Sequence, residues 1–202
     1  MYKLYDFLPS GNGYKVRLTL TQLGIPYEYQ EVDILTGESR TPEFLSMNPN
    51  GKIPLLKTPE TTLSESNAIL LHLAEGTRLI PEDKLDRARV YQWLFWEQYS
   101  HEPFIATSRF WLHYADDPEK AKAILAEKKP GGLQALKLMD EHLENRTFFV
   151  AESYSIADIA LYAYTHVADE GGFPLEPYPN IQQWLTRVAA QADHITIQQQ
   201  MK

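Results

Sequence analysis

The sequence predicts an α/β domain followed by an all-α domain. Strand-like and helix-like segments alternate over the first 77 residues, and glycine and proline separate them. Beyond Pro81 no strand-like run occurs, and long stretches have helical periodicity. These two patterns place the first domain at residues 1–77 and the second at residues 84–202, with residues 78–83 as a linker.

The first domain begins with a strand, a helix and a second strand. Residues 2–7 predict the first strand. A turn rich in glycine and proline at residues 9–13 ends this strand. Apolar residues then recur at helical spacing over 16–23. Aromatic and branched residues alternate with charged ones over 27–32, which predicts the second strand.

The rest of the first domain predicts two helices around a hairpin. Thr41 precedes a proline and predicts the start of a helix over 42–47, since proline is well tolerated in the first turn. Residues 53–57 and 61–63 predict two strands joined by a small loop, and Ser64 is expected to cap the last helix. The order β-α-β-α-β-β-α is typical of a thioredoxin-like domain.

The second domain is predicted to contain only helices. Residues 84–114 are expected to form one long helix or two, with Pro103 as the kink or break, and Asp117 to start another. Ser155 and Asp158 have the spacing of a capping box, which predicts a further helix start.

The composition excludes several classes of protein. A net charge of −8, spread along the chain, disfavours binding to nucleic acid or to an anionic membrane. The sequence has neither a signal-peptide pattern nor an apolar run of about eighteen residues, so we expect a cytoplasmic protein. It also has no cysteine, which excludes disulfides, thiolate metal sites and a cysteine nucleophile.

The turn Ser10-Gly11-Asn12-Gly13 is the first candidate site. Backbone amides and the positive end of the following helix favour an anion there. Alternatively, Ser10 and Asn12 only satisfy the turn and cap the helix. A dinucleotide site is disfavoured because Val16 occupies the third glycine position of that fingerprint.

Two further segments favour a ligand. A cis bond between Ile53 and Pro54 could leave the Ile53 backbone groups available to an extended peptide. At a predicted helix start, the Ser66 hydroxyl and backbone N–H groups could hold a carboxylate, while Glu65 takes an ammonium. The alternatives are that the serines are only helix caps and that Lys52 is a solvated loop charge.

No metal is expected. The six histidines show no metal-type spacing such as His-x-x-x-His, and most are expected to be surface or core residues. They are His72, His101, His113, His142, His166 and His194.

In this order and spacing, these segments closely resemble the glutathione transferase family across essentially the whole chain, and most closely its bacterial Nu-like type. In that type the turn reads Thr-Pro-Asn-Gly, where this sequence has Ser10-Gly11-Asn12-Gly13. The resemblance implies a thioredoxin-like domain that binds glutathione as co-substrate and a helical domain that supplies much of the second-substrate pocket. It also implies a homodimer, a role in detoxification, and small-molecule electrophiles or disulfides as partners.

The resemblance also implies roles for individual residues. Ser10 and Asn12 would stabilise the thiolate, with Tyr5 as a rival to Ser10 because other types of the family use a tyrosine. The match weakens at Ser39 and Arg40, which are left out of the expected site.

The glutathione-binding residues follow by the same matching. Ile53 would pair through its backbone with the cysteinyl part, and Pro54 would be the cis proline. Glu65 and Ser66 would hold the γ-glutamyl end, and Lys52 would lie near the glycyl carboxylate.

The expected function is therefore activation of the glutathione thiol for attack on an electrophile, with glutathione-dependent disulfide reduction as a further possibility. The alternative is a non-catalytic ligand carrier or protein-interaction module. The aromatic-rich segment 93–114 is explained ordinarily by helix packing. Because that segment faces the thiol in the resembling family, four of its residues are expected to contact the electrophile: Tyr99, Phe104, Arg109 and Phe110.

Overall fold

The computed structural model describes residues 1–199. It consists of two compact units. Unit 1 contains residues 1–77 and the segment that begins at Ala192, and unit 2 contains residues 78–191. The thioredoxin-like N-terminal fold and the helical C-terminal part predicted from the sequence are both confirmed.

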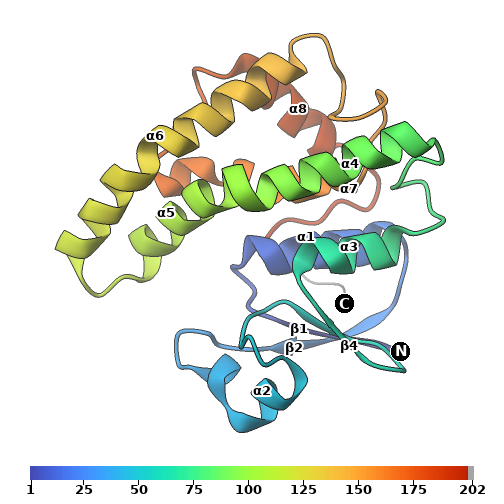
Figure 1. Ribbon diagram of the computed structural model, residues 1–202, viewed down its shortest axis with the longest axis vertical. Helices are drawn as coiled ribbons and strands as arrows, with labels where there is room; N and C mark the ends of the chain where they lie inside the picture. Colours follow the sequence, from blue (N-terminus) through green and yellow to red (C-terminus); the bar gives the residue numbers. More distant parts are fainter. Residues whose placement is uncertain (200–202) are drawn as a thin grey trace. The chain divides into compact units, whose positions relative to one another are not determined.

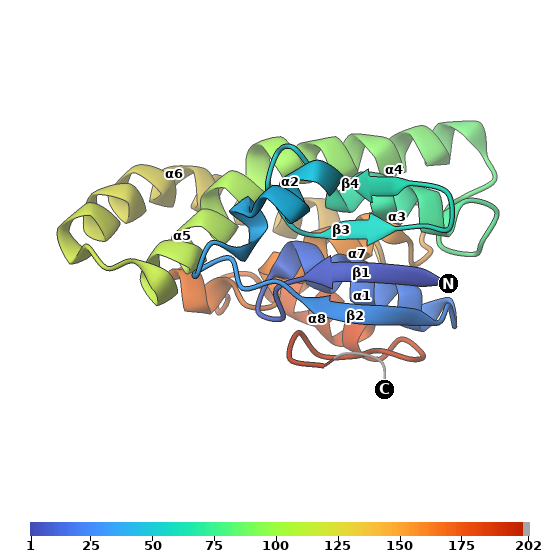
Figure 2. The ribbon, with the colours of Figure 1, turned by 90° about the horizontal axis from the view of Figure 1, so that it is seen from below.

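Unit 1 is built on a four-stranded mixed sheet in the order β2-β1-β3-β4 (Figure 2). The central strand β1 pairs in parallel with β2 and antiparallel with β3, and β3 pairs antiparallel with β4. The strands are β1 (Tyr2–Asp6), β2 (Tyr27–Glu31), β3 (Leu55–Lys57) and β4 (Thr62–Ser64).

Helices cover both faces of this sheet (Figure 1). Helices α1 (Gly11–Gln22) and α3 (Ser66–Ala74) lie together on one face, and the short α2 (Pro42–Met47) lies on the other. As predicted, Thr41 caps α2, since its hydroxyl accepts a hydrogen bond from the Phe44 amide at 3.3 Å.

The predicted cap of α3 is wrong. Ser64 is the last residue of β4, where it pairs with Leu55, and α3 begins two residues later at Ser66. The residue before the helix is Glu65, which has a positive φ of 68° and makes no side-chain cap. Because Ser64 is paired with Leu55 in the β3–β4 hairpin, it lies too early in the chain to be the N-cap residue of α3.

The segment after Ala192 packs on α1 in unit 1, whereas the sequence placed it in the helical domain. The Tyr14 hydroxyl donates to the Ile195 carbonyl at 2.7 Å, and Arg17 donates to the Ile197 carbonyl at 3.1 Å. The Ile197 side chain is buried. These contacts come from α1 side chains, so periodicity within the segment could not indicate them.

Unit 2 contains five α-helices. The break predicted near Pro103 is confirmed, because a π-helical segment at Glu97–His101 separates the first helix from the second, which carries Pro103 in its first turn. A 3₁₀ turn at Ala168–Gly171 lies between the last two. The helices are α4 (Lys84–Trp96), α5 (Glu102–Tyr114), α6 (Pro118–Leu143), α7 (Ile156–Thr165) and α8 (Pro179–Ala189).

Helix α6 continues through Pro130 and two glycines. A Cβ atom on Gly131 would lie 2.3 Å from the Phe104 ring, and one on Gly132 would lie 2.3 Å from the Phe173 ring. The glycines therefore let two aromatic rings pack directly against the helix backbone, and this packing compensates for their low helix propensity.

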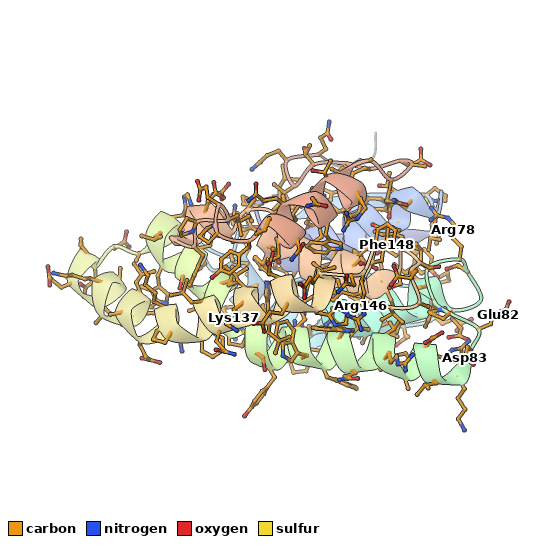
Figure 3. The ribbon with its side chains drawn as sticks, turned by 90° about the horizontal axis from the view of Figure 1, so that it is seen from above. Arg78, Glu82, Asp83, Lys137, Arg146 and Phe148 are labelled. Atoms are coloured by element: carbon orange, nitrogen blue, oxygen red, sulfur yellow. The ribbon has the colours of Figure 1, made fainter. Side chains whose placement is uncertain are left out.

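The core of unit 2 surrounds α7, all ten residues of which are buried. The predicted capping box starts this helix: Ser155 Oγ accepts from the Ala157 amide at 3.2 Å, and the Asp158 carboxylate accepts from the Ser155 amide at 3.0 Å. Phe148 lies in the connection between α6 and α7 (Figure 3) and packs edge-on against Tyr154. Over residues 1–199, no helix has the length and hydropathy needed to span a bilayer.

Candidate functional site

The first candidate turn lies at the start of α1 in unit 1. Ser10 is the N-cap residue, and its Oγ accepts a hydrogen bond from the Gly13 amide at 3.3 Å. The Ser10 amide donates to the Phe7 carbonyl at 2.7 Å, which closes the loop before the helix. Since the hydroxyl is an acceptor in the cap, its proton can still be donated to a ligand.

A buried ion pair between β1 and α1 holds this turn in place. Arg17 Nε donates to Asp6 Oδ2 at 2.9 Å, and neither side chain is exposed. Asp6 Oδ1 accepts from the Phe7 amide at 2.7 Å, and Arg17 Nη2 donates to the Leu8 carbonyl at 2.6 Å. The pair therefore holds both ends of the strand-to-helix connection. An isolated Asp and Arg carry no motif, so this pair cannot be recognised in the sequence alone.

Gly13 is required because the backbone of α1 lies very close to the Asp6 side chain. A Cβ atom there would lie 1.5 Å from Asp6 Oδ1. Glycine therefore allows α1 to approach the end of β1 closely enough for the buried carboxylate to fit between them.

The charge of Asp6 makes stability depend on pH. Burial raises the pKa of Asp6 from 3.8 to about 7, although Arg17 lowers it. Because the folded-state pKa lies above the unfolded value, the folded protein binds more protons between these two values. The contribution of Asp6 to the free energy of unfolding should therefore decrease as pH rises from about 4 to about 7.

Asp6→Asn tests this dependence, because asparagine does not titrate. We expect the free energy of unfolding of wild type, measured with urea, to fall more steeply between these pH values than that of the variant. The difference between the two slopes is the informative quantity, since the variant also weakens the contact with Arg17. Parallel pH profiles would contradict the assignment.

The second candidate segment is the loop that enters β3. The Ile53–Pro54 bond is cis, as predicted. Asn48 Nδ2 donates to the Lys52 carbonyl at 2.7 Å and holds the loop. Within residues 1–199, the backbone N–H and C=O of Ile53 form no hydrogen bond, so both groups can pair with an extended ligand. The side chain of Lys52 is exposed.

The third segment is the start of α3. Glu65 is exposed and has φ 68° and ψ 110°, a conformation that residues other than glycine seldom adopt. Such strain is concentrated at functional sites. Ser66 Oγ donates to Asn12 Oδ1 at 3.1 Å and accepts from Lys15 Nζ at 3.5 Å. The starts of α1 and α3 are thus linked through side chains.

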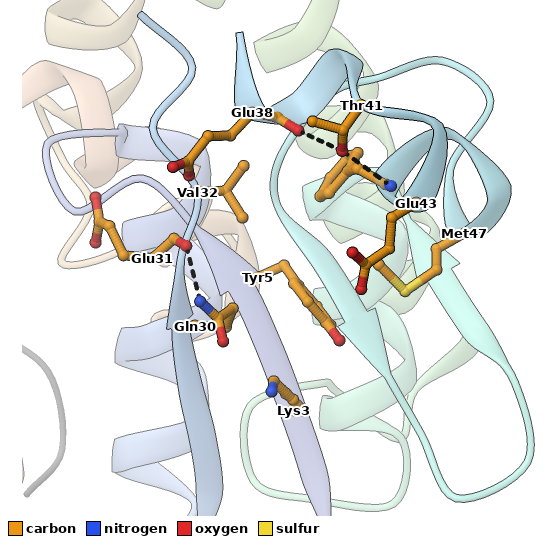
Figure 4. A pocket seen from close by; sticks show the side chains of 10 residues that line it. Lys3, Tyr5, Gln30, Glu31, Val32, Glu38, Thr41, Glu43 and Met47 are labelled. Atoms are coloured by element: carbon orange, nitrogen blue, oxygen red, sulfur yellow. Dashed lines mark hydrogen bonds between the residues drawn. The ribbon is translucent and has the colours of Figure 1, made fainter. Parts of the chain in front are cut away.

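Tyr5 lies on the opposite face of β1 from its buried neighbours Leu4 and Asp6, as strand alternation requires. Its ring lines a pocket of about 330 Å³ between the sheet and α2 (Figure 4). The centroids of the Tyr5 and Phe44 rings are 6.3 Å apart, and Lys3 Nζ lies 5.4 Å from the Tyr5 centroid. The pocket lining combines the apolar side chains of Val32, Phe44 and Met47 with the acidic residues Glu31, Glu38 and Glu43. Its lining residues are Lys3, Tyr5, Gln30, Glu31, Val32, Glu38, Thr41, Glu43, Phe44 and Met47.

The four expected electrophile contacts lie in unit 2, in different environments. Tyr99, in the π-helical segment, is 84% exposed. Phe104 is half-buried against Gly131. Arg109 is buried, and its Nε donates to Glu170 Oε2 at 2.6 Å. Phe110 is exposed at 42%.

No metal centre is formed by the described residues. Across residues 1–199, no group of three or more His, Asp or Glu side chains is arranged to hold an ion. His101 is buried, and its Nε2 lies 2.9 Å from the Thr165 hydroxyl. His142 stacks on Phe149, and burial lowers its pKa.

Comparison with known proteins identifies the family. The model for the glutathione S-transferase N-terminal domain matches residues 1–75, and the model for the C-terminal domain of the same family matches residues 97–192. The chain belongs to the glutathione S-transferase family, as the sequence predicted.

Its relatives include bacterial proteins of similar length. The chain is 32% identical to the disulfide-bond oxidoreductase YfcG of Escherichia coli K12, covering 93% of this chain and 90% of that protein. It is 50% identical to a glutathione S-transferase of Pseudomonas fluorescens, with a TM-score of 0.94 and coverage of 97% and 98%. A possible glutathione S-transferase of Rhodopseudomonas palustris is 47% identical, with a TM-score of 0.96 and coverage of 100% and 91%.

Proposed function

We propose that this protein is a glutathione transferase that binds glutathione in unit 1 and activates its thiol for attack on an electrophile. The observation that carries the proposal is the hydrogen bond from Ser66 to Asn12, which joins the start of α3 to the turn that presents Ser10. In this proposal, one ligand contacts both helix starts: its γ-glutamyl end lies at Glu65 and Ser66, and its sulfur lies at the turn.

The remaining glutathione contacts follow from the loop before β3. The unpaired backbone groups of Ile53 suit the cysteinyl part of an extended tripeptide, with cis-Pro54 shaping the loop. The exposed ammonium of Lys52 suits the glycyl carboxylate. Tyr5 is a weaker candidate than Ser10 for the sulfur contact, because its ring is in contact with Phe44 and Lys3 on the face of the sheet that α2 covers.

The chemistry requires only that the thiolate be favoured over the thiol. A free thiol has a pKa of about 8.5, and lowering it by two units requires about 3 kcal/mol. A hydrogen bond to a charged group contributes about 1.5 to 3 kcal/mol, and a helix N-terminus about 0.3 to 1. Ser10, Asn12 and α1 could together supply this. The thiolate then forms a bond from sulfur to carbon while the leaving group departs with its electron pair.

The activated glutathione could instead reduce disulfides. This more specific reaction is favoured by the relative YfcG, which is named a disulfide-bond oxidoreductase. One glutathione thiolate attacks a disulfide and releases a thiolate, and a second glutathione attacks the mixed disulfide and releases the other, which yields oxidised glutathione. The chain has no cysteine, so both exchanges must occur between bound small molecules.

Calorimetric titration with glutathione tests the binding proposal, and we expect binding at or below millimolar concentrations. No detectable binding would favour the non-catalytic carrier or interaction protein. If glutathione binds, turnover of a small disulfide and of a halogenated aromatic should be compared at equal concentrations. Failure on every disulfide would exclude the reductase, and failure on both classes would leave a carrier.

We further propose a cytoplasmic homodimer whose second substrate contacts Tyr99, Phe104, Arg109 and Phe110. Phe95, near the end of α4, and Tyr99, in the π-helical segment that follows it, support the dimer, because they are 72% and 84% exposed and lie four residues apart. Light scattering should give a mass near twice the 23.3 kDa of the chain.

A further inference from the structure

Lys15 is a buried cation beside the proposed thiol turn. Its side chain is inaccessible to solvent in α1, although lysine is rarely buried without a partner. Its Nζ lies 3.5 Å from Ser66 Oγ, which in turn lies 3.1 Å from Asn12 Oδ1. One hydroxyl group therefore connects the ammonium to the asparagine.

The chemistry of these three groups fixes the direction of the hydrogen bonds. An ammonium group can only donate, so Ser66 Oγ must act as the acceptor in its contact with Lys15. The single hydroxyl proton is then donated to Asn12, and only the amide oxygen can accept it. Asn12 consequently turns its oxygen toward Ser66 and its nitrogen, which carries two donors, away from Ser66.

Without the ammonium, the serine could instead accept a hydrogen bond from the Asn12 amide nitrogen. The asparagine oxygen would then point to the other side, where it would repel a thiolate. The two arrangements differ by a flip of the amide, and the contact of Lys15 with Ser66 favours the one in which Asn12 accepts from Ser66.

We propose that Lys15 is a positioning residue that acts through Ser66 to present the Asn12 amide nitrogen to the glutathione sulfur. The inference rests on the proposed function, since it assumes that Asn12 contacts the thiolate. It assigns a role to a residue that the sequence motif did not include.

Lys15→Met and Lys15→Gln test the inference through the pKa of the bound thiol, measured from thiolate absorbance against pH. We expect each variant to raise the proton affinity of the bound thiol about tenfold, one pKa unit. At pH values below the pKa of the bound thiol, the turnover number kcat should be about tenfold lower than in wild type, with a smaller change in KM. Lys57→Met, which removes an exposed lysine at the end of β3, is the matched control and should change neither.

The Asn12→Ala background separates positioning from a direct effect of charge. If Lys15 acts through Asn12, adding Lys15→Met to Asn12→Ala should leave the thiol pKa unchanged. An undiminished shift in that background would overturn the relay, and so would an unchanged pKa in the single variants. A wild-type protein that does not bind glutathione in calorimetry would instead contradict the proposed function.

A measurement on the wild type covers the case in which the variants do not fold. The side-chain amide protons of Asn12 can be followed by NMR in the glutathione complex as the thiol titrates. We expect their chemical shifts to follow the thiol pKa, and no such change in the complex with S-methylglutathione. Shifts that are insensitive to the thiol would overturn the inference.

Discussion

Replacing Ser10 with alanine is expected to lower kcat/KM for glutathione-dependent turnover by roughly 10- to 100-fold. The hydroxyl is proposed to donate a hydrogen bond to the thiolate, and such bonds to a charged group contribute about 1.5 to 3 kcal/mol. The pKa of the bound thiol should rise by about one to two units for the same reason. Steady-state kinetics and the pH dependence of thiolate absorbance measure the two effects.

Ser10 also caps α1, so controls must separate the cap from the donor. Glycine at an N-cap costs only a few tenths of a kcal/mol, whereas alanine costs about 1 kcal/mol. Ser10→Gly should therefore retain stability and still lose activity, and Ser10→Thr should keep both. Full activity with an unchanged thiol pKa in Ser10→Gly would show that the hydroxyl does not contact the sulfur.

Replacing Asp158 with alanine is expected to lower the free energy of unfolding by about 3 to 5 kcal/mol, because buried N–H groups that lose an acceptor cost about 1 to 3 kcal/mol each. Its Oδ1 accepts from the Phe149 amide at 3.1 Å and from Trp184 Nε1 at 3.0 Å. Its Oδ2 accepts from the Ser155 amide at 3.0 Å and from Ser155 Oγ at 3.1 Å. Urea unfolding monitored by tryptophan fluorescence measures the change.

Asp158→Asn and Ser155→Ala should each lower the free energy of unfolding by less than Asp158→Ala does. Asp158→Asn keeps an oxygen for Phe149 and Trp184 but faces the Ser155 amide with a donor, so it should destabilise less than alanine. Ser155→Ala removes one cap and should cost about 1 kcal/mol. A loss for Asp158→Ala no larger than for Ser155→Ala would mean that water replaces the carboxylate.

Local signals in the sequence predicted most of the elements. Thr41 before Pro42, the break near Pro103 and the box of Ser155 with Asp158 each act within a few residues, so they could be identified without the fold. Ser64 was assigned wrongly because strand pairing and helix capping competed for the same residue. The pairing of Ser64 with Leu55 is a contact between two segments, so a pattern of neighbouring residues cannot predict it.

The candidate site shows the same division. Ser10, Asn12, Ile53 and Pro54 stand out in the sequence because turn, cap and cis-proline chemistry require particular residue types. Lys15 has no such signature, since a lysine in a helix is usually solvated. Its burial depends on the packing of α1 against α3.

The sequence by itself determined the two-part architecture, the family and the absence of a protein thiol, because each depends on composition or on spacing along the chain. Only the tertiary structure revealed that Arg17 pairs with Asp6, that Lys15 reaches Asn12 through Ser66, and that the segment after Ala192 packs on α1. The physical reason is that buried polar and charged groups need hydrogen-bonding partners, and at these positions the partners come from other segments. The identity of those partners is set by how helices and strands pack, and not by their order in the sequence.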